Sequence, residues 1–207
     1  MTTAEKLYHQ FFVSNDFDRI DLFELLTKSY KIQRALYPGS FVHITPSFFI
    51  PSVTYVDSDR RCPSFFADPA IRRMVQNRKC YDENTEIVFH HGDYFKPIDE
   101  ETDSYDLLIS QWAGPISQAC KRYLKVGGIL LVNNSHGDAS IASLDQDYQF
   151  AATITKRNGK YRINQNNSEG YFVPKSGKVI TTREIESLSR GIAYTKSAAM
   201  YIFKRVQ

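Results

Sequence analysis

The sequence predicts an α/β protein with a doubly wound, mostly parallel sheet that has helices on both faces. Two observations support this prediction. From about residue 33 short strands alternate with helices, and the strands are nearly continuous apolar runs. Strands of that kind are buried on both faces, as is typical of parallel sheets. A hairpin signal at 150–164 adds an inserted β-hairpin in the C-terminal third.

The elements are expected in the following order. Apolar side chains at helical spacing predict helices within the first thirty residues, the second capped by Asp16 or Asp18. Strands are expected at 33–37, 53–57, 86–90, 105–110, 129–133 and 199–206. Further helices are expected after the cap Asp68, from Pro115 to the stop at Gly127–Gly128, and after Thr181, which forms a capping box with Glu184.

A chain of 207 residues fits one domain and can bury a core without a disulfide or a metal. We therefore expect a single domain over 1–207. Its parts are a helical appendage (1–32), a Rossmann-like core (33–134 and 178–207) and an insertion (135–177) that contains the hairpin 150–164. Asn158 and Gly159 supply the two positive φ angles of a type I′ turn in that hairpin, which is interpreted as a lid or a partner surface.

Composition narrows the class of protein. The net charge of +3 is below that of a dedicated nucleic-acid-binding domain, so a nucleic-acid partner is not expected. Three widely spaced cysteines argue against a disulfide framework and for a reducing compartment. The N-terminus lacks the order of a signal peptide, and no apolar run is long enough to span a membrane. We expect a cytoplasmic protein, and the sequence does not indicate its oligomeric state.

Ligands of parallel α/β sheets bind at the carboxyl ends of the strands, so the residues after each strand are the candidates. Here these are Pro38-Gly39-Ser40, Asp57, the segment 91–94, Ser110-Gln111-Trp112 and the segment 133–138. His90, His91 and Asp93 superficially suggest a metal site. Adjacent histidines on a strand point to opposite faces, so no metal site is predicted.

Four segments resemble those of class I S-adenosylmethionine-dependent methyltransferases. ALYPGS (35–40) resembles the first strand and its glycine loop, and VTYVD (53–57) the second strand with its terminal acid. HHGDY (90–94) resembles the segment after strand three. YDLLIS (105–110) and LKVGGILLV (124–132) resemble strand four and the turn into strand five.

This resemblance implies S-adenosylmethionine as the cofactor and, in our interpretation, a small-molecule methyl acceptor. It implies contacts with the cofactor from Tyr37, Gly39 and Ser40 at the methionine part, Asp57 with Ser58 at the ribose, Asp93 and Tyr94 at the adenine, and Ser110 and Gln111 near the transferred methyl group. Trp112 and His136 are substrate-side candidates, for stacking on a planar acceptor and for general-base catalysis.

Other interpretations remain open at this point. Gly39 is the only glycine before residue 92, and Tyr37 stands near the place where the family usually has an acid. The alternative function is therefore a non-catalytic, methyltransferase-like binding or scaffold protein that has lost cofactor binding. Asp59 is an alternative ribose-binding acid. A nicotinamide-binding protein is disfavoured because no Gly-x-Gly-x-x-Gly motif is present. Trp112 could also be a core or rim residue, and His136 a residue of a polar loop.

Overall fold

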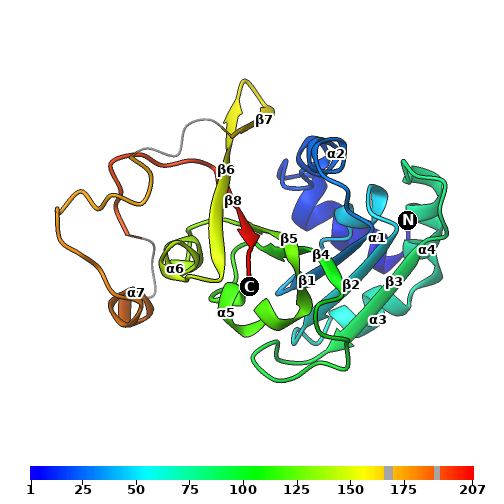
Figure 1. The fold of residues 1–207 in the computed structure, drawn as a ribbon. Helices are drawn as coiled ribbons and strands as arrows, with labels where there is room; N and C mark the ends of the chain where they lie inside the picture. The colour runs from blue at the N-terminus through cyan, green and yellow to red at the C-terminus, as the bar shows by residue number, and fades with distance from the viewer. Residues whose placement is uncertain (166–169, 189–191) are drawn as a thin grey trace. The chain divides into compact units, whose positions relative to one another are not determined.

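The computed structural model describes residues 1–165, 170–188 and 192–207, which form two compact units, 1–98 and 99–207. Figure 1 shows the course of the chain through both. Unit 1 contains, in order, α1 (Thr3–Tyr8), the π-helix η1 (His9–Val13), α2 (Ile20–Ser29), β1 (Arg34–Pro38), the 3-10 helix η2 (Thr45–Phe48), β2 (Ser52–Asp57), α3 (Cys62–Ala67), α4 (Pro69–Arg78) and β3 (Glu86–His91).

Unit 2 contains the remaining elements. They are β4 (Tyr105–Ser110), α5 (Ile116–Ala119), the 3-10 helix η3 (Lys121–Tyr123), β5 (Leu124–Val132), α6 (Asp138–Leu144), β6 (Tyr148–Arg157), β7 (Lys160–Asn164), α7 (Thr182–Leu188) and β8 (Met200–Arg205).

The strands of unit 1 form a parallel sheet in the order β3-β2-β1. The residues of β1 and β2 are almost all buried, as expected from their continuous apolar sequences. The hydroxyl of Tyr55 lies 2.6 Å from Ser47 Oγ in η2, and its ring packs 4.9 Å from that of Phe66 in α3. The segments that connect β1 to β2 and β2 to β3 therefore cover the same face of these strands.

Unit 2 combines parallel and antiparallel pairing. Strands β4 and β5 are parallel, and β8 pairs antiparallel with β5 and with β6. Strand β6 continues into the hairpin with β7, and both turn residues have positive φ angles, 51° at Asn158 and 77° at Gly159. The predicted α/β class, the mostly parallel strands and the inserted hairpin are confirmed.

The helix predicted from Pro115 to Gly127–Gly128 is wrong beyond its first turn. Helix α5 ends at Ala119, and β5 begins at Leu124 rather than at Ile129. Leu124 pairs with Tyr105, after which the register with β4 shifts. A short apolar stripe does not distinguish a helix from a strand, and here pairing with β4 decides the outcome. The two glycines lie in the irregular part of the strand, as glycines in strands often do.

The predicted cap of α2 also needs correction, and two helices were missed. Neither Asp16 nor Asp18 caps α2, because Arg19 occupies the cap position with a φ of 55° and no side-chain cap bond forms. The carbonyl of Asp18 instead accepts a hydrogen bond from the ring of His43. Helices α3 and α6 were not predicted. By contrast, the caps at Asp68 and Thr181 are confirmed.

Gly128 is expected to be intolerant of a side chain. A Cβ atom there would lie 2.8 Å from Leu124 Cδ1 and 2.9 Å from the Lys125 carbonyl oxygen. Because the carbonyl belongs to the backbone, we expect Gly128→Ala to lower the free energy of unfolding by about 1–3 kcal/mol in urea denaturation. Gly92→Ala is the matched control, since a Cβ there meets no atom within 4 Å. Equal stabilities of the two variants would contradict this account of β5.

Candidate functional site

Asp57, the last residue of β2, connects the segments that follow all three strands of unit 1. Its Oδ2 atom accepts a hydrogen bond from the Phe41 amide at 2.7 Å, and its Oδ1 from the Asp59 amide at 2.8 Å. Its backbone carbonyl accepts from the amide of Gly92 at 3.1 Å, just after β3. One residue therefore fixes the carboxyl ends of β1, β2 and β3 relative to each other.

The loop after β1 is tight and has two residues with positive φ angles. Gly39 has a φ of 64° and Phe41 a φ of 47°. The Gly39 amide donates to the Val56 carbonyl at 2.8 Å, which ties the loop to β2. Ser40 is buried, and its hydroxyl donates to the Phe41 carbonyl. A single glycine thus provides the left-handed conformation with which this turn begins.

The hydroxyl of Tyr37 is one end of a buried chain of hydrogen bonds. Its hydroxyl lies 3.0 Å from His43 Nδ1, and His43 Nε2 lies 3.0 Å from the carbonyl oxygen of Asp18. A carbonyl can only accept, so Nε2 holds the proton, Nδ1 accepts and the Tyr37 hydroxyl donates. Burial lowers the pKa of His43 to about 3 and raises that of Tyr37, so both groups are neutral at pH 7.

An aromatic layer covers the loop after β1. The ring of Phe41 contacts that of Phe11 from η1, with centroids 5.0 Å apart, and the guanidinium of Arg61 lies 4.4 Å from the Phe41 centroid. Arg61 also donates two side-chain hydrogen bonds to Asp59, which lower the pKa of that carboxyl to about 2. Both carboxylate oxygens of Asp59 therefore face Arg61.

The segment after β3 contributes polar groups with local partners. His91 Nε2 lies 3.2 Å from the Ser58 carbonyl, so this segment also contacts the residues after β2. Asp93 Oδ1 accepts from the Phe95 amide at 3.0 Å in a local turn. The ring of Tyr94 lies against that of Phe95, with centroids 4.8 Å apart.

In unit 2 the end of β4 is fixed by a buried carboxyl group. Asp138, the first residue of α6, accepts hydrogen bonds from the hydroxyls of Ser110 and Ser117 and from the Ser117 amide. Burial raises the pKa of Asp138, while these donors act in the opposite direction. The cluster joins the last residue of β4 to the first turns of α5 and α6.

The residues after Ser110 form a turn beside the loop that follows β5. Gln111 is buried, whereas Trp112 is exposed and has a φ of 54°. A Cβ atom at Gly114 would lie 3.1 Å from His136 Cβ, so these two loops are in contact. His136 is exposed, and its Nδ1 lies 3.0 Å from the Ser135 hydroxyl. The two substrate-side candidates, Trp112 and His136, therefore belong to adjacent loops of unit 2.

The structure groups the predicted site residues into two sets. Unit 1 brings together the segments that contain Tyr37, Gly39, Ser40, Asp57, Ser58, Asp93 and Tyr94, and unit 2 those with Ser110, Gln111, Trp112 and His136. Four residues that support these sets were not predicted as site residues: His43, Phe41 and Arg61 in the first set, and Asp138 in the second. Of these four residues, only Asp138 could have been identified from the sequence, because it lies shortly after a predicted strand.

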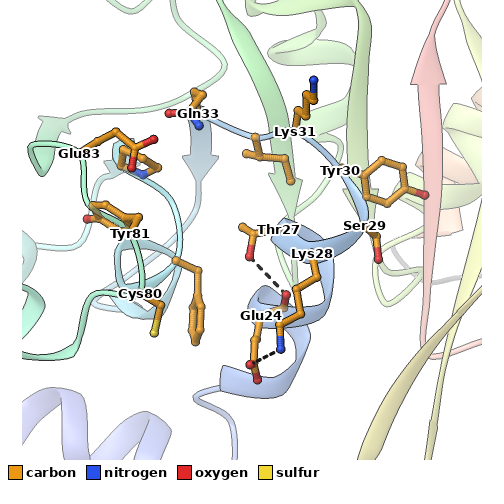
Figure 2. Close-up of a pocket in the computed structure, with 13 residues that line it drawn as sticks. Glu24, Thr27, Lys28, Ser29, Tyr30, Lys31, Gln33, Cys80, Tyr81 and Glu83 are labelled. Carbon is orange, nitrogen blue, oxygen red and sulfur yellow. Dashed lines mark hydrogen bonds and ion pairs between the residues drawn. The ribbon is translucent and has the colours of Figure 1, made fainter.

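A pocket of about 790 Å³ lies at the other end of the unit 1 strands. Its lining includes Gln33, just before β1, and Pro51, just before β2. Figure 2 shows Thr27 of α2 on one side of the pocket and Cys80 and Tyr81 on the other. None of the predicted cofactor-binding residues lines it. The pocket and the predicted site therefore lie at opposite ends of the same strands.

Comparisons with known proteins define the fold. No protein family model matches the sequence, and no curated protein matches it. The structure is similar to that of a methyltransferase from Geobacter sulfurreducens, with 12% identity and a TM-score of 0.53 over 100% of this chain and 91% of that chain. It is also similar to the YcgJ protein from Bacillus subtilis, with 13% identity and a TM-score of 0.50 over 89% of this chain and 98% of that chain.

The chain therefore shares the Rossmann-like fold of these two proteins, one of which is a methyltransferase, and the predicted fold is confirmed. At identities this low, the similarity concerns the fold, and function requires a separate argument from the site. Among the residues that the structure describes, no helix is long and apolar enough to cross a membrane.

The buried His43 predicts a loss of stability in acid. The unfolded chain protonates this imidazole below about pH 6.5, whereas the folded chain does so only near pH 3. In that window the unfolded state binds more protons, so the free energy of unfolding falls by up to about 1.4 kcal/mol per pH unit as the pH decreases. Urea denaturation should show a shallower pH dependence for His43→Gln. His9→Gln, at an exposed position, should keep the wild-type slope; the same slope in both variants would contradict the assignment.

The Asp138 cluster predicts a second stability effect. Asp138→Ala leaves two hydroxyls and one amide without their acceptor inside unit 2. We expect the free energy of unfolding to fall by about 2–4 kcal/mol. Asp106→Ala is the control, because that carboxylate pairs with the half-exposed Lys125, and such pairs contribute about 1 kcal/mol or less. A loss at Asp138 no larger than at Asp106 would refute the structural role of the cluster.

Proposed function

We propose that this protein is an S-adenosylmethionine-dependent methyltransferase that acts on a small molecule. The observation that supports the proposal most strongly is the position of Asp57, a carboxylate at the end of the second parallel strand that binds the loop after the first. In an α/β sheet this is where ligands bind. The fold shared with a methyltransferase of known structure adds independent support.

Asp57 is suited to hold the two ribose hydroxyls of the cofactor. Each of its carboxylate oxygens accepts one amide hydrogen bond, and a carboxylate oxygen has lone pairs for a second. Ser58 lies beside it in the chain. Asp59, the alternative acid, faces Arg61 with both oxygens, and we therefore assign the ribose to Asp57.

The remaining cofactor contacts in unit 1 follow from the resemblance and fit the structure in part. Gly39 gives the backbone room to approach the methionine part, with Ser40 next to it. Tyr37 is buried and neutral, and its hydroxyl donates to His43, so it provides no negative charge for a ligand ammonium group. Asp93 and Tyr94 lie after β3, where the adenine is expected.

Bound S-adenosylmethionine would supply an electrophilic methyl group on a good leaving group. The protein then needs mainly to orient the acceptor and to exclude water. Ser110 remains a predicted neighbour of the methyl group through its position at the end of β4, although its hydroxyl donates to Asp138. His136 is proposed as the base that takes the proton of an acceptor hydroxyl, and Trp112 as a stacking surface.

Calorimetric titration with S-adenosylmethionine and S-adenosylhomocysteine tests this function. We expect micromolar binding to the wild-type protein and a loss of about 10–100-fold in Asp57→Ala, because hydrogen bonds to a charged acceptor are removed. Asp59→Ala is the matched control two residues away and should bind normally. Thermal denaturation of both variants verifies that they fold.

Two outcomes would contradict the proposal. No heat from either ligand with the folded wild-type protein would favour the non-catalytic, methyltransferase-like protein instead. A larger loss in Asp59→Ala than in Asp57→Ala would move the ribose site to the alternative acid.

A further inference from the structure

Strand β7 is an edge of the sheet in unit 2. In the described part of the chain, β6 is the only strand that pairs with it. Strand β8 pairs with β6 no further than Ile154, so the distal half of the hairpin, which Figure 1 shows in yellow, consists of two strands only. The side of β7 that faces away from β6 can therefore accept a further strand.

The turn of the hairpin determines which backbone groups of β7 face outward. Arg157 and Lys160 flank the two-residue turn, and in such hairpins this pair exchanges both of its backbone hydrogen bonds. Pairs of this kind alternate along the strands, so the backbone groups of Tyr161 and Ile163 point away from β6. Among the described residues, neither takes part in a backbone hydrogen bond outside the hairpin. The N–H and C=O groups of both residues are thus available at this edge.

One face of the hairpin has a concentration of positive charge. Residues that pair across two strands share a face, and the faces alternate along each strand. Arg157, Lys160 and Arg162 therefore lie on the same face, and all three are exposed. Within the part of the chain that the structure describes, none of them forms an ion pair. Arg157 lies directly opposite Lys160, and like charges in that position repel, so an anionic partner would relieve the repulsion.

The spacing of these charges fits a peptide in an extended conformation. Lys160 and Arg162 are two residues apart, which is about 6.6–7 Å along a strand. Alternate side chains of an added strand have the same spacing. Because Arg162 lies between the two residues whose backbone groups face outward, it would form a non-hydrogen-bonded pair with the added strand. Side chains are closest in pairs of that kind.

Other occupants fit this edge less well. If two β7 strands of two copies paired antiparallel in symmetric register, two Arg162 side chains would lie opposite each other and repel. A nucleic acid would neutralise the cations, but it has no backbone that matches the N–H and C=O groups of a strand. Only a peptide can satisfy both features of the edge, and the charge requires it to be acidic.

We propose that β7 is a docking edge for an acidic peptide segment of a partner protein, which adds to the sheet as a further strand. The backbone of this segment bonds to Tyr161 and Ile163, and its acidic side chains at alternate positions pair with Lys160 and Arg162. Arg157, one strand further in, adds to the positive potential. The surface contains none of the residues assigned to cofactor or acceptor, so this inference goes beyond the proposed function.

Fluorescence anisotropy with the full chain tests the proposal. The probe is a fluorescein-labelled synthetic peptide in which glutamate alternates with threonine. With glutamate opposite Arg162, the threonine amides face β7 and the glutamate amides face away. We expect the peptide to bind, N-methylation of its threonines to weaken binding at least about tenfold, and N-methylation of its glutamates to change it less than about twofold.

Charge reversal in the hairpin tests the second feature of the edge. The double variant Lys160→Glu with Arg162→Glu should lose binding of the glutamate peptide by about tenfold or more. It should instead bind a peptide in which lysine alternates with threonine, a gain that unfolding could not produce. Lys175→Glu, at another exposed position of unit 2, is the matched control and should bind the glutamate peptide as the wild-type protein does.

Three results would overturn the proposal. They are no binding of the glutamate peptide to the wild-type protein, equal weakening by the two N-methylations, and an unchanged affinity in the double variant. Duplex DNA and vesicles that contain phosphatidylserine are tested beside the peptide. Binding of either one without binding of the peptide would assign the cations to another polyanion and would also reject strand addition.

Discussion

The carboxylate and the carbonyl of Asp57 accept hydrogen bonds from Phe41, Asp59 and Gly92, one residue from each segment that follows a strand of unit 1. These amides lie where the parallel strands end, and each would otherwise need another partner. The arrangement orients a negative group at the edge of the sheet and fixes the loops around it. The other cofactor contacts proposed in unit 1 depend on this constraint, because those loops contain them.

The end of β4 in unit 2 is built on the same principle, with a buried carboxyl group rather than a half-exposed one. Asp138 receives its donors from Ser110 and Ser117 and holds the first turns of two helices. A fully satisfied buried network of this kind is rigid. Gln111, the residue after Ser110, differs in that its buried Oε1 atom has no hydrogen-bond partner among the described residues.

Local patterns in the sequence predicted much of the fold. The strands at 53–57, 86–90 and 105–110 agree with β2, β3 and β4 to within one residue at each end, because continuous apolar runs bounded by polar residues are clear signals. The start of β5 could not be predicted, since it depends on pairing with Tyr105, which is distant in sequence. The cap of α2 was missed because the Asp18 carbonyl binds the distant His43.

The candidate site was predictable where it depends on strand ends and was not where it depends on contacts between loops. The sequence identifies Asp57 as a candidate because it is an acidic residue at the end of a predicted strand. The hydrogen bond between Tyr37 and His43, whose burial keeps its imidazole neutral at pH 7, follows only from the packed structure. Likewise, the two side-chain hydrogen bonds from Arg61 engage both carboxylate oxygens of Asp59, and the sequence alone does not show that these bonds form.

Hydrogen exchange measured by mass spectrometry with and without S-adenosylhomocysteine tests whether the cofactor binds at the strand ends around Asp57. We predict slower exchange in the segments 37–41, 57–59 and 91–94, whose amides bind Asp57 or surround it. Protection confined to the segments 24–33 and 80–83, which line the pocket at the opposite strand ends, would contradict it.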